Sequence, residues 1–331
     1  MNKRAIGFVL LVLTLAGVVV LSVTVGSRGL PPETIWAALT HHEPALPEHL
    51  IVSEVRVPRT VIGLIAGMAL GLAGAVVQGV TRNPLADPGI LGVNAGAALF
   101  VVIGISVFGL TDLIGYVWFS FAGAAGAAVL VYLIGAMGSG GATPVKIALS
   151  GAALSAVLGA ATTAVLLTDA DTFEEFRLWQ VGSLAGRGAE VAVQAAPFLL
   201  IGAVLALASA RVLNALGMGD DVAVSWGQNV TAGRLLCGAA VVLLCGAATA
   251  MAGPIGFVGL VVPHMARIVT GPDHRWLLPY AMILAPVLLL SADVLGRIVA
   301  HPGEVQVGIV TAVIGAPVFV ALARRRRLAE L

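Results

Sequence analysis

The sequence predicts an all-α membrane protein whose chain crosses the bilayer about ten times. The mean hydropathy is +1.03, and only 11% of the residues are charged. Soluble domains carry about 25% charged residues, so most of this chain must face lipid or other apolar helices. Uncharged apolar runs long enough to span a bilayer recur along the sequence. The 41 glycines fit this class, because small residues let helix backbones approach closely in lipid.

The apolar runs define the expected spans and a single transmembrane domain over residues 1–331. The first run follows Lys3 and Arg4 and exceeds the apolar core of a secretory signal, so we expect a spanning helix there. The eighth run is short and opens at Gly253-Pro254, which predicts a broken or tilted span. The spans are expected near residues 5–25, 60–79, 90–108, 115–137, 145–167, 192–210, 232–251, 256–270, 277–299 and 305–323.

The distribution of Lys and Arg predicts the orientation. With a cytoplasmic N-terminus, twelve of the 18 basic residues lie inside and six outside, which satisfies the positive-inside rule. Ten spans then place both termini in the cytoplasm, and Arg324–Arg327 would anchor the last span against anionic headgroups. The long connections are expected to be external at residues 26–58 and 168–191, and cytoplasmic at residues 211–234.

The second external connection contains a short helix signal. Asp and Thr residues near 168–172 can cap a helix that carries Phe173, Phe176 and Trp179.

Two groups of possible ligands are interpreted as unremarkable. His41 and His42 could bind a metal together with Glu43, but adjacent histidines in a polar loop are more often solvated. Cys237 and Cys245 lie eight residues apart on one span, too far to bridge each other, and we interpret them as small apolar residues. We therefore predict no metal site and no cofactor.

Residues 56–92 are the most distinctive stretch of the chain. Arg56 and Arg59 flank Pro58 before an uncharged run that leads to Gln78. A polar turn follows, Arg82-Asn83-Pro84-Leu85-Ala86-Asp87-Pro88, in which each proline removes a backbone donor and disfavours helix before it. Irregular backbone is not tolerated against lipid, so this turn must lie at an interface or line a protected cavity.

The cytoplasmic connection is expected to hold a short amphipathic helix. Asp220 and Asp221 are acids of the type favoured at a helix N-terminus, and Gly227 is a typical stop. Val222, Ala223 and Trp226 would form one apolar face. This face could lie on the membrane, pack beneath the bundle or dock into a partner.

These stretches resemble the permease subunits of iron-siderophore and vitamin B12 ABC importers of the FecCD type, over essentially the whole chain. The resemblance lies in the residue 56–92 stretch and in three later motifs: Trp179-x-x-Gly182-Ser183-Leu184, Gly253-Pro-Ile-Gly-Phe-Val-Gly259-Leu-x-x-Pro263-His264 and Gly308-Ile-x-Thr311-x-x-x-Gly315-x-Pro317. It implies a ten-span permease of the bacterial inner membrane that pairs with a second copy or a close relative. Two ATP-binding subunits would bind below and a substrate-binding protein above. The cargo would be a ferric siderophore or related metal chelate, with haem and cobalamin as alternatives.

The resemblance also assigns roles to individual residues. It implies a cytoplasmic gate formed by Asn83, Leu85, Thr143 and Pro144, in a pathway lined by the fifth and tenth spans. It implies ATPase coupling by Asp220, Asp221, Ala223, Trp226 and Gly227. It implies docking of the binding protein by Arg56, Arg59 and Arg297. Local alternatives stay open: Asn83 could simply cap its turn, and the arginines could extend to headgroups or, for Arg297, pair with Asp293.

Competing function classes leave few traces in the sequence. The chain has no Gly-x-x-x-x-Gly-Lys-Ser/Thr loop, so we expect ATP hydrolysis to occur in a separate subunit. His-Glu-x-x-His and Gly-x-Ser-x-Gly hydrolase motifs are also missing. The main alternative is a secondary transporter driven by an ion gradient, which would need buried ionisable groups such as His264, Arg267 or Asp293. A weak inverted repeat, in which Arg59 and Arg234 open corresponding spans of the two halves, is compatible with either transporter class.

Overall fold

The computed structural model describes residues 3–110, 113–137 and 143–324, and all regular structure within these ranges is helical. Every expected span coincides with a helix. Seven of the described helices are long and apolar enough to cross a membrane, whereas α5, α13 and the apolar part of α15 are shorter. The ten helices at the expected positions are α1 (Lys3–Thr24), α4 (Val57–Thr81), α5 (Val93–Phe108), α6 (Leu113–Ala136), α7 (Pro144–Thr168), α9 (Ala189–Ala208), α12 (Val230–Ala252), α13 (Val258–Thr270), α14 (His274–Val299) and α15 (Val307–Arg324).

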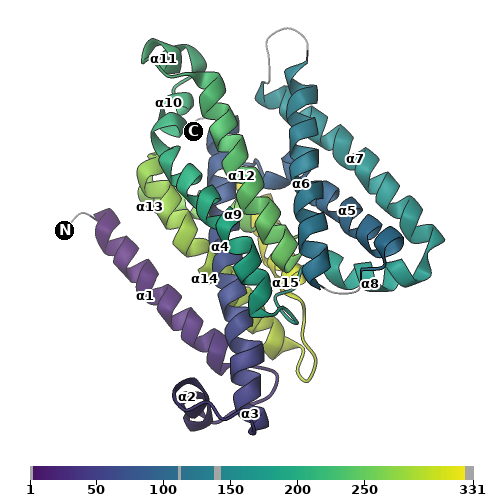
Figure 1. Cartoon of the computed structure of the whole chain (residues 1–331). Coiled ribbons are helices and arrows are strands. Elements are labelled where there is room, and N and C mark those ends of the chain that lie inside the picture. Colours follow the sequence, from purple (N-terminus) through teal and green to yellow (C-terminus); the bar gives the residue numbers. More distant parts are fainter. Residues whose placement is uncertain (1–2, 111–112, 138–142, 325–331) are drawn as a thin grey trace.

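Helix α4 is the centre of the bundle. It runs through the middle of the molecule and packs against α9, α12, α13 and α14 (Figure 1). Small residues make these contacts close: Gly67 lies against Pro286, and Gly74 lies against the backbone of Gly259. A Cβ atom at position 74 would overlap the Gly259 carbonyl oxygen, so the crossing of α4 and α13 requires glycine there.

Helices α5, α6 and α7 form a second group beside this core (Figure 1). Gly96 of α5 and Gly123 of α6 face each other, and a Cβ atom on either would overlap the other's carbonyl oxygen. The 3-10 turn η2 (Pro88–Leu91) packs against α7, where Gly151 contacts the carbonyl oxygen of Ile90. The Pro-bounded turn after α4 therefore leads directly onto α7.

Helix α8 (Ala170–Gln180) forms in the second connection expected to be external, where the sequence predicts a short helix. The Asp169 carboxylate caps it by accepting a 3.0 Å hydrogen bond from the Thr172 amide. Phe176 and Trp179 are buried in the bundle, whereas Phe173 is exposed.

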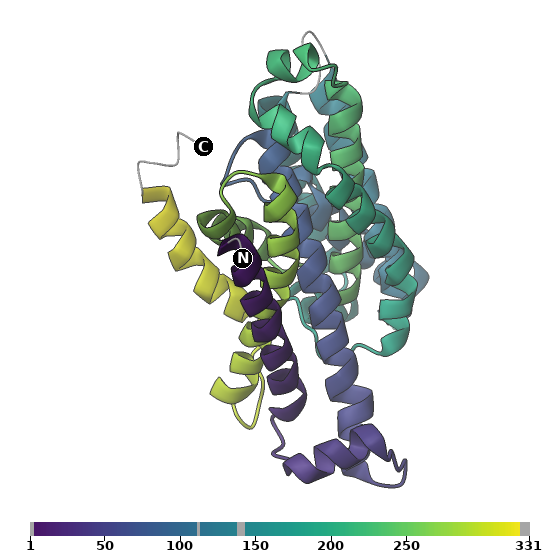
Figure 2. The ribbon, with the colours of Figure 1, turned by 90° about the vertical axis from the view of Figure 1, so that its left-hand side faces the viewer.

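The first connection expected to be external, at residues 26–58, contains more helix than the predicted loop. It forms α2 (Pro32–Thr40), α3 (Pro47–Leu50) and the π-helical turn η1 (Ile51–Arg56), which continues into α4. Ile35, Ala38 and Val52 form a small apolar core there. Figure 2 shows these elements at one end of the molecule. In the described ranges, no three His, Cys, Asp or Glu residues are grouped so that they could hold a metal ion.

The opposite end carries α10 (Ala210–Gly217) and α11 (Asp220–Ser225), which fill the connection expected to be cytoplasmic (Figure 1). Helix α1 lies along α14, and only 17% of its apolar window is buried. Its far end is held mainly by side chains from other helices, as described below.

Candidate functional site

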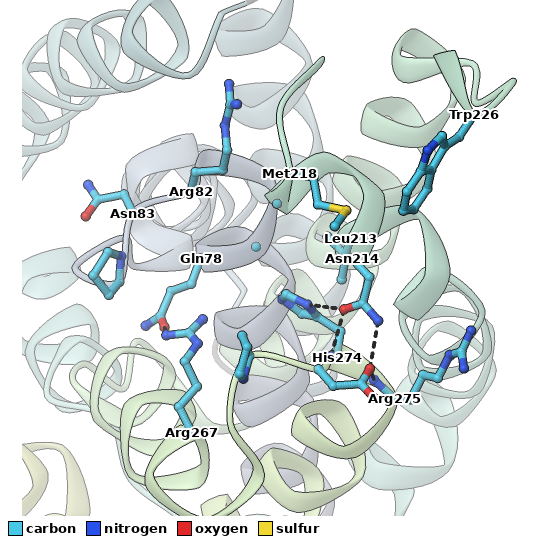
Figure 3. A pocket seen from close by; sticks show the side chains of 15 residues that line it. Gln78, Arg82, Asn83, Leu213, Asn214, Met218, Trp226, Arg267, His274 and Arg275 are labelled. Atoms are coloured by element: carbon cyan, nitrogen blue, oxygen red, sulfur yellow. Dashed lines mark hydrogen bonds between the residues drawn. The ribbon is translucent and has the colours of Figure 1, made fainter. Parts of the chain in front are cut away.

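A cavity of about 570 Å³ lies at the end of the bundle that carries α11. Three separate segments line it: the C-terminal turn of α4, the α10–α11 segment and the connection from α13 to α14 (Figure 3). The cavity brings Asn83, an expected gate residue, and Trp226, an expected coupling residue, to one site. Its main side chains are Gln78, Arg82, Asn83, Leu213, Asn214, Met218, Trp226, Arg267, Asp273, His274 and Arg275.

The α4 side of the cavity is an abrupt helix end. Arg82 adopts a left-handed conformation with φ of 50°, and the Asn83 amide donates to the Gln78 carbonyl at 3.2 Å. This pattern is a Schellman ending with arginine where glycine is usual. The Asn83 Oδ1 atom accepts a 2.9 Å hydrogen bond from the Leu85 amide. Asn83 therefore caps the Pro-bounded turn, which was the local alternative to a gate role.

Gln78 joins α4 to α13 at the floor of the cavity. Its Nε2 atom donates to the Leu260 carbonyl at 3.1 Å, and its Oε1 atom accepts from Arg267 Nη1 at 2.9 Å. Arg267 is thus engaged by a neutral amide inside the bundle, and Figure 3 shows the two side chains meeting. This contact gives Arg267 a packing role between two helices.

Asn214 joins α10 to the start of α14. Its Oδ1 atom accepts from the His274 amide and faces His274 Nδ1, both at 2.9 Å, and its Nδ2 atom donates to Asp273 at 2.7 Å. Asp273 also caps α14 by accepting from the Arg275 amide at 3.0 Å. Burial alone would raise the pKa of Asp273, but the hydrogen bonds from Asn214 and Arg275 outweigh it and hold that pKa below its ordinary value.

The short helix α11 forms where the sequence placed it, with Asp220 in its first turn. Its expected apolar face is divided, however. Ala223 is fully buried against Ala215 and Leu216 of α10, whereas Trp226 is 61% exposed. Helix α11 ends at Ser225, and Trp226 is its C-terminal cap residue. Of the three residues expected on one apolar face, Ala223 therefore packs on α10, whereas Val222 and Trp226 stay exposed.

Asp220 connects three elements at the end of the bundle. Its carboxylate lies 2.8 Å from Arg234 Nη2 at the start of α12 and 3.6 Å from Arg82 Nη2 after α4. The exposed pair between Arg82 and Asp220 contributes little stability, about 0–1 kcal/mol. The Arg234 side chain is only 16% exposed. These pairs fix the position of α11: one joins it to the start of α12, and the other joins it to the Pro-bounded turn.

Two of the three arginines expected to receive a partner belong to a buried cluster at the α2–α3 end, formed by Arg59, Asp293, Arg297 and Glu304. Asp293 is fully buried and accepts from Arg59 Nη2 at 2.8 Å and from Arg297 Nε at 3.1 Å. Arg59 Nη1 donates to Glu304 at 2.6 Å. The predicted pairing of Asp293 with Arg297, four residues apart on α14, is confirmed.

Arginine side chains from this region also fix the end of α1. Arg297 Nη1 donates to the carbonyls of Ser22 and Val25 at 2.7 and 2.8 Å. Arg56 Nη1 donates to the carbonyls of Val23 and Thr24 at 3.0 and 2.7 Å. The last carbonyls of α1 have no partner within their own helix, so these guanidinium groups satisfy them.

Arg56, Arg59 and Arg297 are 3%, 5% and 2% exposed, and all three are engaged within the subunit. Their role in docking stays a prediction. The other gate residues occupy local structural positions. Leu85 is half-buried, and the Thr143 hydroxyl caps α7 by accepting from the Lys146 amide at 3.4 Å, with Pro144 as the first helical residue.

Sequence reasoning missed Asn214 and Asp273 as members of the site. Gly271-Pro272-Asp273 before an apolar run is a helix-start signal that could have identified Asp273. Nothing around Asn214 marks it, because its partners lie 59 and 60 residues away.

The similarity to known proteins extends over nearly the whole chain. The model of the FecCD transport family matches residues 11–325. The chain is 44% identical over 324 residues to the ferric enterobactin transport system permease protein FepD of Escherichia coli strain K12, covering 98% of this chain and 96% of that protein. It is 35% identical over 330 residues to the hemin transport system permease protein HmuU of Yersinia pestis, covering 98% and 96%.

A solved structure of a metal-chelate type ABC transporter in an inward-facing conformation has the same fold. The TM-score is 0.84 at 27% sequence identity, over 97% of this chain and 99% of that one. The order of the motifs, the helical bundle and these relatives agree. The chain is therefore a membrane permease that belongs to the FecCD transport family.

Proposed function

We propose that two copies of this chain form the translocation pathway of an ATP-driven importer for a ferric siderophore or a related metal chelate. The relatives named for ferric enterobactin and hemin support a chelate cargo. In this proposal ten spans place both termini in the cytoplasm. Helix α11 of each copy faces one of two ATP-binding subunits, and α2 and α3 face a substrate-binding protein. The chain itself hydrolyses no ATP.

The exposed apolar residues of the α11 segment carry the proposal. Val224 and Trp226 are 60% and 61% exposed on a helix end that lies beyond the spanning segments (Figure 1). Exposed apolar side chains outside the lipid-facing surface mark a contact site, and tryptophan is enriched among residues that dominate binding. Asp220 joins this surface to Arg82 beside the proposed gate. A push on α11 from an ATP-binding subunit would therefore reach the Pro-bounded turn.

The surface of α7 supports pairing of two copies. Only 11% of its apolar window is buried within one subunit, the lowest value among the described candidate spans. The helix packs against η2, at the end of the Pro-bounded turn, and begins at Pro144 with Thr143 as its cap. Pairing across α7 and α15 would place Asn83 and Leu85 of both copies around one pathway. An apolar ring of Leu85 side chains would then exclude water, as hydrophobic gates do.

The arginines proposed to dock a binding protein are buried, so docking must begin at the exposed part of their cluster. The guanidinium groups are buried, and Glu304, with a side chain 29% exposed, is the member of the cluster that solvent reaches. Acidic residues of a binding protein would have to replace Glu304 on Arg59 or act through the positive field of the cluster. Arginine suits this exchange because its planar fork binds carboxylates with two donors.

The defining experiment is uptake into proteoliposomes that contain the permease, its ATP-binding subunits and its binding protein. We expect ferric-siderophore uptake that requires ATP and persists when a protonophore removes the proton gradient. Uptake that follows the proton gradient without ATP-binding subunits would overturn the proposal and favour a secondary transporter. Asp293, one candidate for a proton carrier, is already held by two arginines, which opposes that alternative.

A variant pair tests the coupling role of α11. Val224→Asp places a charge on the exposed apolar surface and should reduce uptake while the permease stays folded. Val224→Thr keeps the size of the side chain and adds no charge, so it is the matched control and should retain uptake. Ala223 is unsuitable for this test because it is buried against α10, so a large residue there would disrupt the subunit itself.

A further inference from the structure

A second cavity, of about 450 Å³, lies between the spanning helices, away from the cavity described above. Figure 1 shows α6 and α12 diverging toward the end that carries α11, and the cavity lies among α4, α6 and α12. Its lining is almost entirely apolar, and its size is typical of sites that hold a small ligand. Cys237, Gly238, Val241 and Val242 line it from one face of α12.

Several apolar residues that line this cavity are exposed at the surface of the subunit. Val129 and Leu133 of α6 are both 55% exposed, and Leu235 of α12 is 59% exposed. Exposed apolar side chains on spanning helices contact hydrocarbon chains, because water is absent at that depth. The cavity is therefore an apolar groove open toward lipid. Hydrocarbon is the occupant that its lining and its surroundings favour.

One end of the groove is cationic. Arg234 lines it at the start of α12, near the α11 end of the bundle. Its Nη2 atom bonds to Asp220, while its Nε atom is buried and has no hydrogen-bond partner. Arg82 shares the same carboxylate at 3.6 Å, so one acid faces two guanidinium groups. The positive charge at this end is only partly compensated, which favours an anionic headgroup.

We propose that this groove binds one acyl chain of an anionic phospholipid, with its phosphate on Arg234. A guanidinium group binds phosphate oxygens through charge-assisted hydrogen bonds. The acyl chain would lie along the apolar lining, and the phosphate would lie at the end that carries Arg234. The bound phosphate would compete with Asp220 for Arg234 and change how firmly α11 is held. This regulatory part rests on the proposed coupling role of α11, whereas lipid binding does not.

Gly238 offers a direct way to fill the groove. A Cβ atom built at this position meets no atom within 4 Å, so Gly238→Leu should occupy the groove without disturbing its helix. Gly17 on α1 is the matched control, since a Cβ atom there also meets no atom and the residue lies outside the groove. Arg234→Gln tests the headgroup separately from the acyl chain.

The test is native mass spectrometry of the purified permease with phosphatidylglycerol or phosphatidylcholine. We expect the wild type and Gly17→Leu to retain phosphatidylglycerol about fivefold better than phosphatidylcholine, as one basic residue at a lipid surface provides. Gly238→Leu should lose this retention, and Arg234→Gln should bind both lipids equally. Equal retention of the two lipids by the wild type, or unchanged retention by Gly238→Leu, would overturn the proposal.

A second measurement addresses regulation in the assembled importer. Adding phosphatidylglycerol to phosphatidylcholine nanodiscs should change the number of ATP molecules hydrolysed per chelate transported by the wild type and by Gly17→Leu, but not by Gly238→Leu. The same response in all three proteins would refute regulation through the groove. Lipid binding is measured on the permease alone, so a failure of the proposed importer function would not be mistaken for a failure of the lipid site.

Discussion

Replacing Asp293 with Asn tests whether the buried arginine cluster stabilises the subunit. The carboxylate is fully buried and accepts from two arginines, Arg59 and Arg297. Asparagine keeps the shape of the side chain but removes the charge, so two guanidinium groups remain in the interior. Glu304 still contacts Arg59, and the carbonyls at the end of α1 still contact Arg297.

The expected loss follows from this geometry. Removing one partner of a buried ion pair costs about 3–5 kcal/mol, because an uncompensated charge is left behind. The remaining contacts of both arginines place Asp293→Asn near the lower bound, about 3 kcal/mol. Glu304→Gln removes the partly exposed acid instead and should cost about 1 kcal/mol or less, as surface pairs do.

Unfolding of the purified permease by sodium dodecyl sulfate in mixed micelles provides the free energies. Wild type, Asp293→Asn, Arg297→Gln, Glu304→Gln and the double variant Asp293→Asn/Arg297→Gln should be compared. The double variant should lose less than the sum of the single losses, because both changes remove the same contact. A loss below about 1 kcal/mol for Asp293→Asn would refute the argument and show that Glu304 and the carbonyls at the end of α1 are enough to hold the two arginines.

Three further outcomes follow from other parts of the structure. Gly74→Ala should cost at least about 1–3 kcal/mol in the same unfolding assay, because its Cβ would overlap the α13 backbone, whereas Gly126→Ala meets no atom and should be neutral. Burial alone would raise the pKa of Glu304, but the hydrogen bond and charge of Arg59 outweigh it and lower that pKa. The Glu304 contribution to stability should therefore be complete above the ordinary carboxyl pKa of 4.5 and be lost as the pH falls through the lowered value, a loss that Glu304→Gln lacks when unfolding is measured against pH. Asp169→Ala should cost about 1 kcal/mol by removing the cap of α8, and hydrogen exchange at the Thr172 amide should accelerate.

The helical positions were predictable because lipid imposes a strong constraint on sequence. A segment in the bilayer must satisfy its own backbone, so each uncharged apolar run lies on a helix. The same reasoning placed too little helix in residues 26–58. Glu48, Glu54 and Arg56 lower the hydropathy there without breaking a helix, so the chain is helical from Pro47. Hydropathy identifies segments that contact lipid. It therefore does not identify helices, or parts of helices, that lie outside the bilayer.

The burial of the arginines shows a second limit of sequence reasoning. Asp293 and Arg297 were expected to pair because they lie four residues apart on one helix. Arg59 gave no such signal, since its partner Asp293 is 234 residues away. A basic residue at a membrane boundary can face headgroups, a partner or the interior, and hydropathy does not distinguish these environments. The gate and coupling residues rest on motif resemblance, because their roles depend on contacts between subunits.

The capping of α1 by distant arginines sets an order for assembly of the chain. During synthesis α1 emerges first, while Arg297 on α14 emerges after about nine-tenths of the 331 residues. Until then the final carbonyls of α1 can accept hydrogen bonds from Arg56 but not from Arg297. Little of the helix is buried against its neighbours. The first helix inserted is thus among the last to be locked in place. A chain that stops before α14 would carry an N-terminal helix whose end is held by Arg56 but not by Arg297.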